Sequence, residues 1–291
     1  MIFSMTGYGK ASMTYQDKKI TVEIRTLNGR HTDVRFRIPQ NYREREHILR
    51  KMVLDKAVRG KIEVVVDVLS TGGDDAYGLN QPLFKKYYQE LTQLSEELQI
   101  PQGDIMTAIL RIPNVVVAEE GELSDEEWAV VRNVCKQAIE KLLLFRSTEG
   151  AALEKDLKGR IEAIQSVLAQ VNPFEEERVE NLRTRLRQRL DEYMNKEEVD
   201  ENRFEQEVLF YLEKIDINEE KVRLAQHCKY FLEEMAKKEV SKGKKLGFIS
   251  QELGREINTM GAKAYSHEIQ RLVVDMKDEL EKIKEQVMNV V

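Results

Sequence analysis

The sequence predicts an α+β protein, in which a small N-terminal β-sheet domain with one helix precedes a long, mainly α-helical C-terminal body. Alternation of apolar and polar residues, typical of half-buried strands, is confined to roughly the first seventy residues. From there on, apolar residues recur at helical spacing, and the terminal helix has a coiled-coil-like repeat. The composition agrees, because 34% of the residues are charged and only 7% are aromatic. We expect three regions, at residues 1–75, 76–200 and 201–291.

The N-terminal region is predicted to run strand, strand, helix, strand. The dipeptide Asn28-Gly29 is a strong turn signal between the first two strands. Gly60 follows the helix and can adopt the left-handed conformation that ends it. Residues 3–13 are a candidate for a further strand at the sheet edge. The predicted strands are 20–24, 34–38 and 62–68, and the predicted helix is 43–58.

The rest of the chain is predicted to be a succession of helices. Ser124 and Glu127 have the spacing of a capping box, which opens a helix that continues to about residue 171. Pro173 ends that helix, and Gly243 and Gly247 indicate a break before Phe248. Further helices are predicted at 83–98, at 175–193, twice within 204–240, and at 269–287.

Composition excludes several classes of protein. A 291-residue chain with 41% hydrophobic residues can bury a core, and it has no apolar run of the length that crosses a membrane. Its start lacks the basic and apolar regions of a signal peptide. Two distant cysteines imply no disulfide framework, so we expect a reducing cytoplasm and, for Cys135, an inert buried thiol.

The net charge of −6 conceals two basic segments. Residues 25–61 contain eleven lysines and arginines against four acids, and residues 237–245 contain five lysines against one glutamate. Basic segments in an acidic chain are typical of a phosphate-binding surface. A solvated helix face and loop would explain them as well.

The segment 251–263 is the strongest candidate for chemistry. On a helix, Glu252, Arg255, Glu256 and Thr259 share one face. Two carboxylates one turn apart can hold a hydrated Mg²⁺, which polarises a phosphoryl oxygen or lowers the pKa of bound water. An ordinary exposed helix with a Glu252–Arg255 ion pair is the alternative. Common nucleotide-binding loops, a nucleophile elbow and zinc-ligand spacings are absent from the sequence.

The segment 214–227 is a second candidate. Asp216 and Glu219 have capping-box spacing at the start of a helix, and Glu220, Arg223 and His227 then follow along one face. A histidine titrates near neutral pH, so His227 could act as a general acid or base. A capped helix with a surface ion pair is the alternative.

A third candidate joins the segment 23–30 to residues 59–61. Arg25 and Arg30 flank the predicted turn, and Asn28 can hydrogen-bond to a sugar or a base. Arginines on the open face of a strand that keep a sheet edge soluble are the alternative.

Taken together, these segments resemble the YicC (YloC) family of bacterial proteins. Ala262, where serine is frequent, is a small departure. The resemblance implies a cytoplasmic endoribonuclease, a hydrolase that uses a divalent metal, Mg or Mn, to cleave single-stranded RNA, and it implies a homohexameric ring that clamps RNA. The matching segments are 4–9, 23–30, 59–61, 111–115, 146–150, 214–227 and 243–263.

The matched motifs also suggest site residues. The expected catalytic residues are Glu252, Glu256 and His227. The expected metal ligands are Glu252, Glu256, Asp216 and Glu220. The expected RNA-binding residues are Arg25, Asn28, Arg30, Arg59, Lys61, Arg223, Lys244, Lys245, Arg255 and Lys263.

Two other functions remain open at this point. The protein could be a non-catalytic adaptor that binds RNA and delivers it to another nuclease. It could also be a helical scaffold without a role on RNA, because the heptad-like seam of residues 269–287 would be an association surface if exposed. We expect homo-oligomerisation and no membrane partner.

Overall fold

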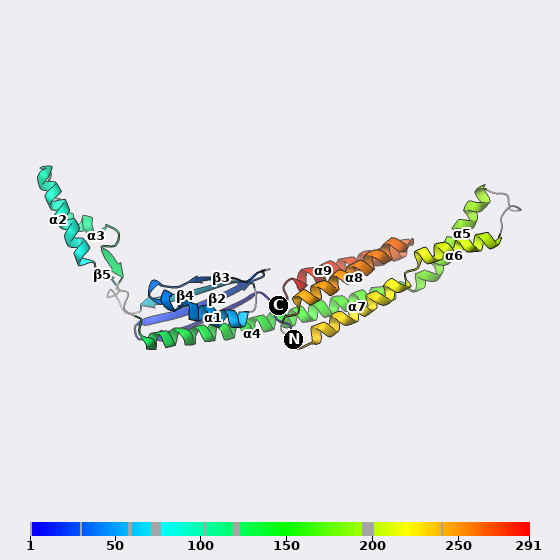
Figure 1. The fold of residues 1–291 in the computed structure, drawn as a ribbon, viewed down its shortest axis with the longest axis horizontal. Coiled ribbons are helices and arrows are strands. Elements are labelled where there is room, and N and C mark those ends of the chain that lie inside the picture. Colours follow the sequence, from blue (N-terminus) through cyan, green and yellow to red (C-terminus); the bar gives the residue numbers. More distant parts are fainter. Residues whose placement is uncertain are drawn as a thin grey trace. The chain divides into compact units, whose positions relative to one another are not determined.

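A computed structural model describes residues 2–29, 31–57, 60–70, 77–101, 103–118, 123–193, 201–239 and 241–291 (Figure 1). By their contacts the residues form two compact units. We call residues 8–25 and 32–142 the sheet unit, and residues 1–7, 26–31 and 143–291 the helical unit. Helix α4 (Asp125–Ala169) contributes to both units. The division into 1–75, 76–200 and 201–291 stays a prediction.

The N-terminal strands form a four-stranded sheet with the order β1-β2-β4-β3. Strand β3 pairs in parallel with β4, and Val34 lies opposite Ile62. The bounds are β1 Gly7–Tyr15, β2 Lys18–Leu27, β3 Asp33–Arg37, the 3-10 turn η1 Gln40–Arg45, α1 Glu46–Ala57 and β4 Lys61–Ser70. The α+β class and the edge strand are therefore confirmed.

The Asn28-Gly29 turn does not join neighbouring strands, because β4 lies between β2 and β3. The helix α1 connects β3 to β4. A parallel pair needs such a crossover, so the helix rather than the turn decides which strands are neighbours.

The first part of α4 packs on β1 within the sheet unit. A Cβ atom on Gly9 of β1 would lie only 2.7 Å from the backbone nitrogen of Leu142, so glycine permits this close approach. Ser124 caps the helix as predicted, because its Oγ accepts from the Glu127 N–H at 3.1 Å. The reciprocal half of the capping box is not formed, since the Glu127 carboxylate accepts from Lys18 at 2.9 Å. Cys135 is buried, which raises its pKa to about 11.

A second, smaller pairing joins β5 (Tyr77–Leu79) and β6 (Val116–Ala118) in antiparallel fashion. Between them lie α2 (Gln81–Glu97), at the predicted stripe, and the short α3 (Ile105–Leu110). The side chain of Asn80 caps α2 by accepting from the Leu83 N–H at 3.2 Å.

The helical unit consists of the end of α4 followed by further helices, and those within residues 217–287 share one apolar core with the end of α4. The predicted seam of the last helix is buried inside the same chain, where Ile269, Met276 and Ile283 are fully buried. It is therefore not an exposed association surface. Pro173 begins a helix because its missing N–H is not needed in the first turn. The helices are α5 Pro173–Tyr193, α6 Glu201–Ile215, α7 Asn218–Ala236, α8 Gly243–Lys263 and α9 His267–Val287.

Two sequence-based predictions about α8 and α7 are wrong in detail. Gly247 lies inside α8 rather than at a break, because burial of Leu246 and Ile249 offsets the roughly 1 kcal/mol that a helical glycine costs. At α7, Asp216 accepts from the Asn218 N–H at 2.9 Å, but Glu219 pairs with Arg223 instead of completing a capping box.

The two ends of the chain meet within the helical unit. The N–H of Met5 donates to the carbonyl of Asn289 at 2.8 Å, and that of Val291 donates to Phe3 at 3.0 Å. The carbonyl of Val291 also accepts from Lys242 at 2.7 Å, where α8 begins. Among the described residues, no helix has the length and apolar character needed to span a membrane.

Candidate functional site

Two ion pairs show how α7 is oriented against α8. Glu220, in the first turn of α7, pairs with Lys263 at the end of α8 at 2.8 Å. Glu234, near the end of α7, pairs with Lys245 near the start of α8, also at 2.8 Å. The two helices are therefore antiparallel, and these four residues mark the two ends of a polar seam between them.

The middle of this seam holds the predicted catalytic residues. His227 follows Glu220 by seven residues, and Glu256 precedes Lys263 by seven. Seven residues are close to two helical turns, so each residue stays on the same face as its predecessor. Since the helices are antiparallel, His227 and Glu256 lie at the same height along the two helix axes. Glu252 lies one helical turn nearer the start of α8.

The two α8 carboxylates differ in their surroundings. Glu256 is 6% exposed and has no hydrogen-bond or ion-pair partner among the described residues. The Glu252 side chain is 42% exposed and accepts from Arg255 at 3.1 Å. A buried carboxylate without a partner beside a more exposed one matches the Mg²⁺ sites that use one or two protein carboxylates and complete the shell with water and phosphate.

The other two predicted metal ligands have different contacts. Asp216 lies before the first turn of α7, where it accepts from a backbone N–H. Glu220 pairs with Lys263, and its Oε2 atom is buried without a partner. Along the helix axes, Glu220 and Glu256 are separated by two helical turns, a rise of about 10 Å. The described residues accordingly contain no group of three or more His, Cys, Asp or Glu side chains placed to hold one ion.

Glu234 closes the far end of the seam and was not predicted as a functional residue. Its side chain is 1% exposed and pairs with both Lys237, at 2.7 Å, and Lys245. Burial raises the pKa of the Glu234 carboxyl, but hydrogen bonds from the two lysines outweigh it, so that its pKa lies below the usual value of 4.5. The same contact raises the pKa of Lys245.

We expect Glu234→Gln to destabilise the protein at neutral pH by about 1–3 kcal/mol, because it removes the charge that the lysines neutralise. Because the folded-state pKa of Glu234 is lowered, the stabilisation is complete above pH 4.5 and is lost as the pH falls through that lowered pKa. The difference between wild type and variant should thus shrink in acid. Urea unfolding between pH 7 and pH 3 measures it, and Glu233→Gln, on the more exposed neighbouring side chain, is the control. A difference that stays constant across this pH range would contradict the assignment.

The predicted RNA-binding cations of the helical unit lie on α7 and α8. Arg223 pairs with Glu219 at 2.5 Å and is exposed. The ammonium group of Lys244 lies 5.9 Å from the ring centre of exposed Phe248. The remaining three are Lys245, Arg255 and Lys263, whose pairs are described above.

The other predicted RNA-binding residues are not all described. In the sheet unit, Arg25 pairs with Glu23 at 2.5 Å and lies 5.9 Å from the ring centre of Tyr8, and Lys61 is exposed at the start of β4. In the helical unit, the Asn28 amide donates to Asn289 at 3.2 Å. Arg30 and Arg59 lie outside the described residues.

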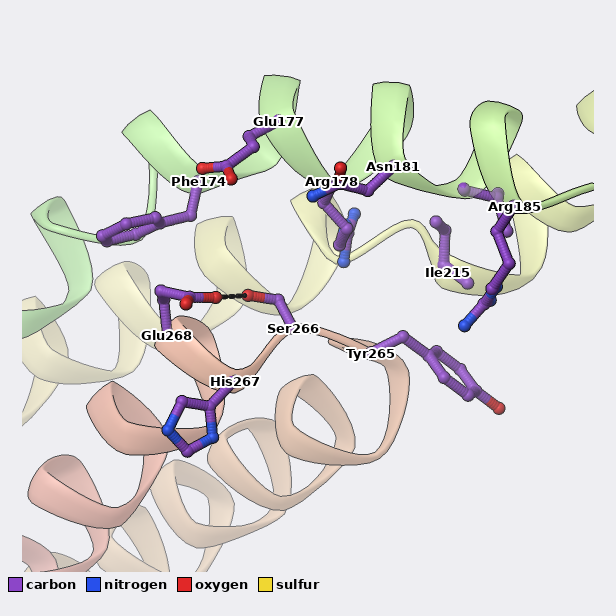
Figure 2. Close-up of a pocket in the computed structure, with 11 residues that line it drawn as sticks. Phe174, Glu177, Arg178, Asn181, Arg185, Ile215, Tyr265, Ser266, His267 and Glu268 are labelled. Carbon is purple, nitrogen blue, oxygen red and sulfur yellow. Dashed lines mark hydrogen bonds between the residues drawn. The ribbon is translucent and has the colours of Figure 1, made fainter. Parts of the chain in front are cut away.

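Sequence reasoning missed a pocket of about 230 Å³ in the helical unit. Figure 2 shows it between α5 and the turn that joins α8 to α9. Arg178 projects from α5 toward that turn, and Tyr265 and His267 lie on the opposite side. No sequence signal could have found it, because its walls come from helices far apart in the chain.

Comparison with known proteins places the chain in one family along nearly its whole length. Residues 2–155 match the family described as endoribonuclease YicC-like, N-terminal region, and residues 171–291 match endoribonuclease YicC-like, C-terminal. The chain is 31% identical over 294 residues to the probable endoribonuclease YicC of Clostridioides difficile strain 630, with all of both chains covered. It is 30% identical over 292 residues to that of Haemophilus influenzae, with 99% of each covered. The chain therefore belongs to the YicC-like endoribonuclease family.

Proposed function

We propose that this protein is an endoribonuclease that cleaves single-stranded RNA with a divalent metal ion, and that it acts in the cytoplasm as a homo-oligomeric ring, a hexamer by family resemblance. The observation that carries the proposal is the middle of the seam between α7 and α8. There, a buried and unpartnered Glu256 lies at the level of His227. Family membership supports RNA as the substrate.

Glu252 and Glu256 are the residues that would hold Mg²⁺ or Mn²⁺. A bound divalent ion supplies polarisation of the phosphoryl oxygen and lowers the pKa of a bound water. Asp216 and Glu220 have an N–H and an ammonium group as partners, so they fit this role less well than Glu256, which has none among the described residues. Glu252 has a partner too, but its ion pair with Arg255 lies at the exposed surface.

The other residues of the seam would transfer protons or bind the phosphate groups of the RNA. His227 would accept a proton from the attacking oxygen or donate one to the leaving oxygen. Arg255, Lys263 and Lys245 offset phosphate charge, and Arg223 and Lys244 extend this positive surface on the exposed faces. Arg25, Asn28 and Lys61, in the N-terminal part of the chain, would also bind RNA.

Cleavage of a labelled single-stranded RNA tests the proposal. We expect highly purified protein to cut internally with Mg²⁺ or Mn²⁺ and to stop when EDTA is added. Sedimentation or light scattering of the same sample measures the oligomer. Cutting that continues at full rate in EDTA would contradict the metal, and a monomer that cuts at full rate would contradict the ring.

The adaptor function is the second candidate. It rests on the exposed cations Arg223 and Lys244, which would bind RNA whether or not a metal ion is held. An adaptor would bind RNA in a salt-sensitive way but never cut it under any metal. The scaffold function loses its support, because the apolar seam of α9 is buried within the chain.

A further inference from the structure

The pocket between α5 and the α8–α9 turn contains a buried cation with unused hydrogen-bonding capacity. Arg178 is 7% exposed, its Nη1 donates to the carbonyl of Ala264 at 3.4 Å, and its Nε has no partner. Burial lowers its pKa, while Glu175 and Asp216 favour the charged form. Each of these two acids is engaged elsewhere, Glu175 with Lys221 at 2.6 Å and Asp216 with a backbone N–H.

An unused buried N–H costs free energy that an acceptor on a ligand would recover. Among the described side chains, no carboxylate forms an ion pair with Arg178. Arg178 lines the pocket, and in Figure 2 its side chain projects from α5 toward the turn that joins α8 to α9. Arg178 is therefore placed to donate to a ligand that presents hydrogen-bond acceptors.

The walls of the pocket do not suit a bare anion. Arg185 adds a second positive charge, but Glu177 and Glu268 offset both arginines. Hydrogen bonds from its own backbone N–H and from Ser266 lower the pKa of Glu268, which favours its charged form. A ligand with acceptors for arginine and donors for glutamate fits this lining better than phosphate alone.

Flat apolar surface completes the pocket. Phe174 lies at one end, and Tyr265 and Arg185 lie together at the other (Figure 2). Tyr265 is 70% exposed and has φ of +43°, a left-handed conformation that is uncommon for a bulky residue. An exposed ring held in this conformation offers a stacking face at the pocket entrance.

We propose that this pocket binds one unpaired guanine base of the RNA strand. Guanine presents two adjacent acceptors, O6 and N7, which match an arginine, and its N1–H and N2 amino group are donors for a carboxylate. Tyr265 stacks on the base, Arg178 reads the acceptor edge, Asn181 borders the same edge, and Arg185 meets the adjoining phosphate. The inference rests on the proposed function, since it takes RNA as the ligand.

Binding of fluorescent oligouridine RNA with one central guanine or adenine tests it, with the full chain in EDTA so that no metal-dependent cleavage occurs. We expect wild type to prefer the guanine RNA by about fivefold or more. A 7-deazaguanine RNA, which lacks the N7 acceptor, should lose most of that preference.

Variants locate the effect in the pocket. Tyr265→Asn keeps a residue that tolerates positive φ and removes the ring, so we expect about fivefold weaker binding of the guanine RNA. Arg178→Met should reduce the guanine-to-adenine ratio to about one, and Asn181→Leu on the exposed face of α5 carries this test if Arg178→Met fails to fold. Tyr211→Asn, on an exposed tyrosine of α6, is the control and should bind as wild type does.

Three results would overturn the inference. One is equal binding of guanine and adenine RNA by wild type, and another is unchanged binding by both Tyr265→Asn and Asn181→Leu. The third is Arg178-dependent binding of GMP with no base preference on RNA, which would assign the pocket to a free nucleotide. These outcomes are separate from the proposed function, because RNA cleavage with metal could persist in each, and a guanine preference could persist in a protein that never cuts.

Discussion

Glu256→Gln is expected to lower the rate of metal-dependent RNA cleavage by about 100-fold or more, while the protein stays folded. The substitution keeps the shape of the side chain and removes the negative charge that would hold the divalent ion. Glu256 has no ion-pair partner among the described residues, so the loss of charge leaves no lysine or arginine unpaired. Initial rates over a range of Mn²⁺ concentrations measure the effect, and partial recovery at high Mn²⁺ would indicate weakened metal binding.

Glu281→Gln provides the matched control for this prediction. Glu281 is an exposed glutamate of α9 that pairs with Lys284 at 2.8 Å in the same helical unit. It should cleave RNA as wild type does. If Glu256→Gln cuts as fast as this control, the assignment of the α8 carboxylate to the metal is wrong. If instead the wild-type protein does not cut RNA at all, the adaptor function gains support.

Gly150→Ala is expected to destabilise the helical unit by about 3 kcal/mol or more. A Cβ atom at this position of α4 would overlap the carbonyl oxygen of Ile2 and lie 2.9 Å from the Cα atom of Phe3. These are backbone atoms, and the segment is held in place because the Ser4 N–H donates to Arg146 at 3.0 Å and the Ile2 N–H donates to Glu154 at 3.1 Å. No side-chain rotation can relieve the clash.

Gly159→Ala tests whether the effect comes from this contact. Gly159 lies in the same helix, and a Cβ atom added there would meet nothing within 4 Å. Alanine at this position should therefore stabilise the protein by about 0.5–1 kcal/mol through helix propensity. Urea unfolding followed by circular dichroism measures both variants. Equal stability of the two variants would contradict the close approach of the N-terminal segment to α4.

The sequence alone predicted most of the elements, because their signals are local. Alternation in residues 20–24 predicted β2, and the β-branched residues within 62–68 predicted β4. The heptad-like spacing of residues 269–287 predicted α9. It did not predict Gly247 inside α8, because the tertiary packing that offsets the cost of a helical glycine involves residues distant in the chain. The sequence did not predict the order of the strands in the sheet either, because the turn signal at Asn28-Gly29 does not show which strands are neighbours.

For the candidate site, the sequence identified residue types and their helical faces. It placed Glu252 and Glu256 one turn apart and His227 along the α7 face, and the resemblance of the whole chain to the YicC family was confirmed. The metal ligands and the RNA contacts stay predictions. Sequence spacing within one helix cannot tell whether a carboxylate is buried or has a partner on another helix, as Glu220 and Glu234 do.

Periodicity and motif content by themselves determined the α+β class, the existence of the long helices and the family. Only the tertiary structure decided the level of His227 against Glu256, the burial of the α9 seam, the pairing of the two chain ends and the pocket around Arg178. The physical reason is the separation along the sequence over which each kind of interaction acts. Backbone hydrogen bonds and amphipathic faces act within a few residues, whereas register, burial and cavities arise from side chains that packing brings together across the length of the chain.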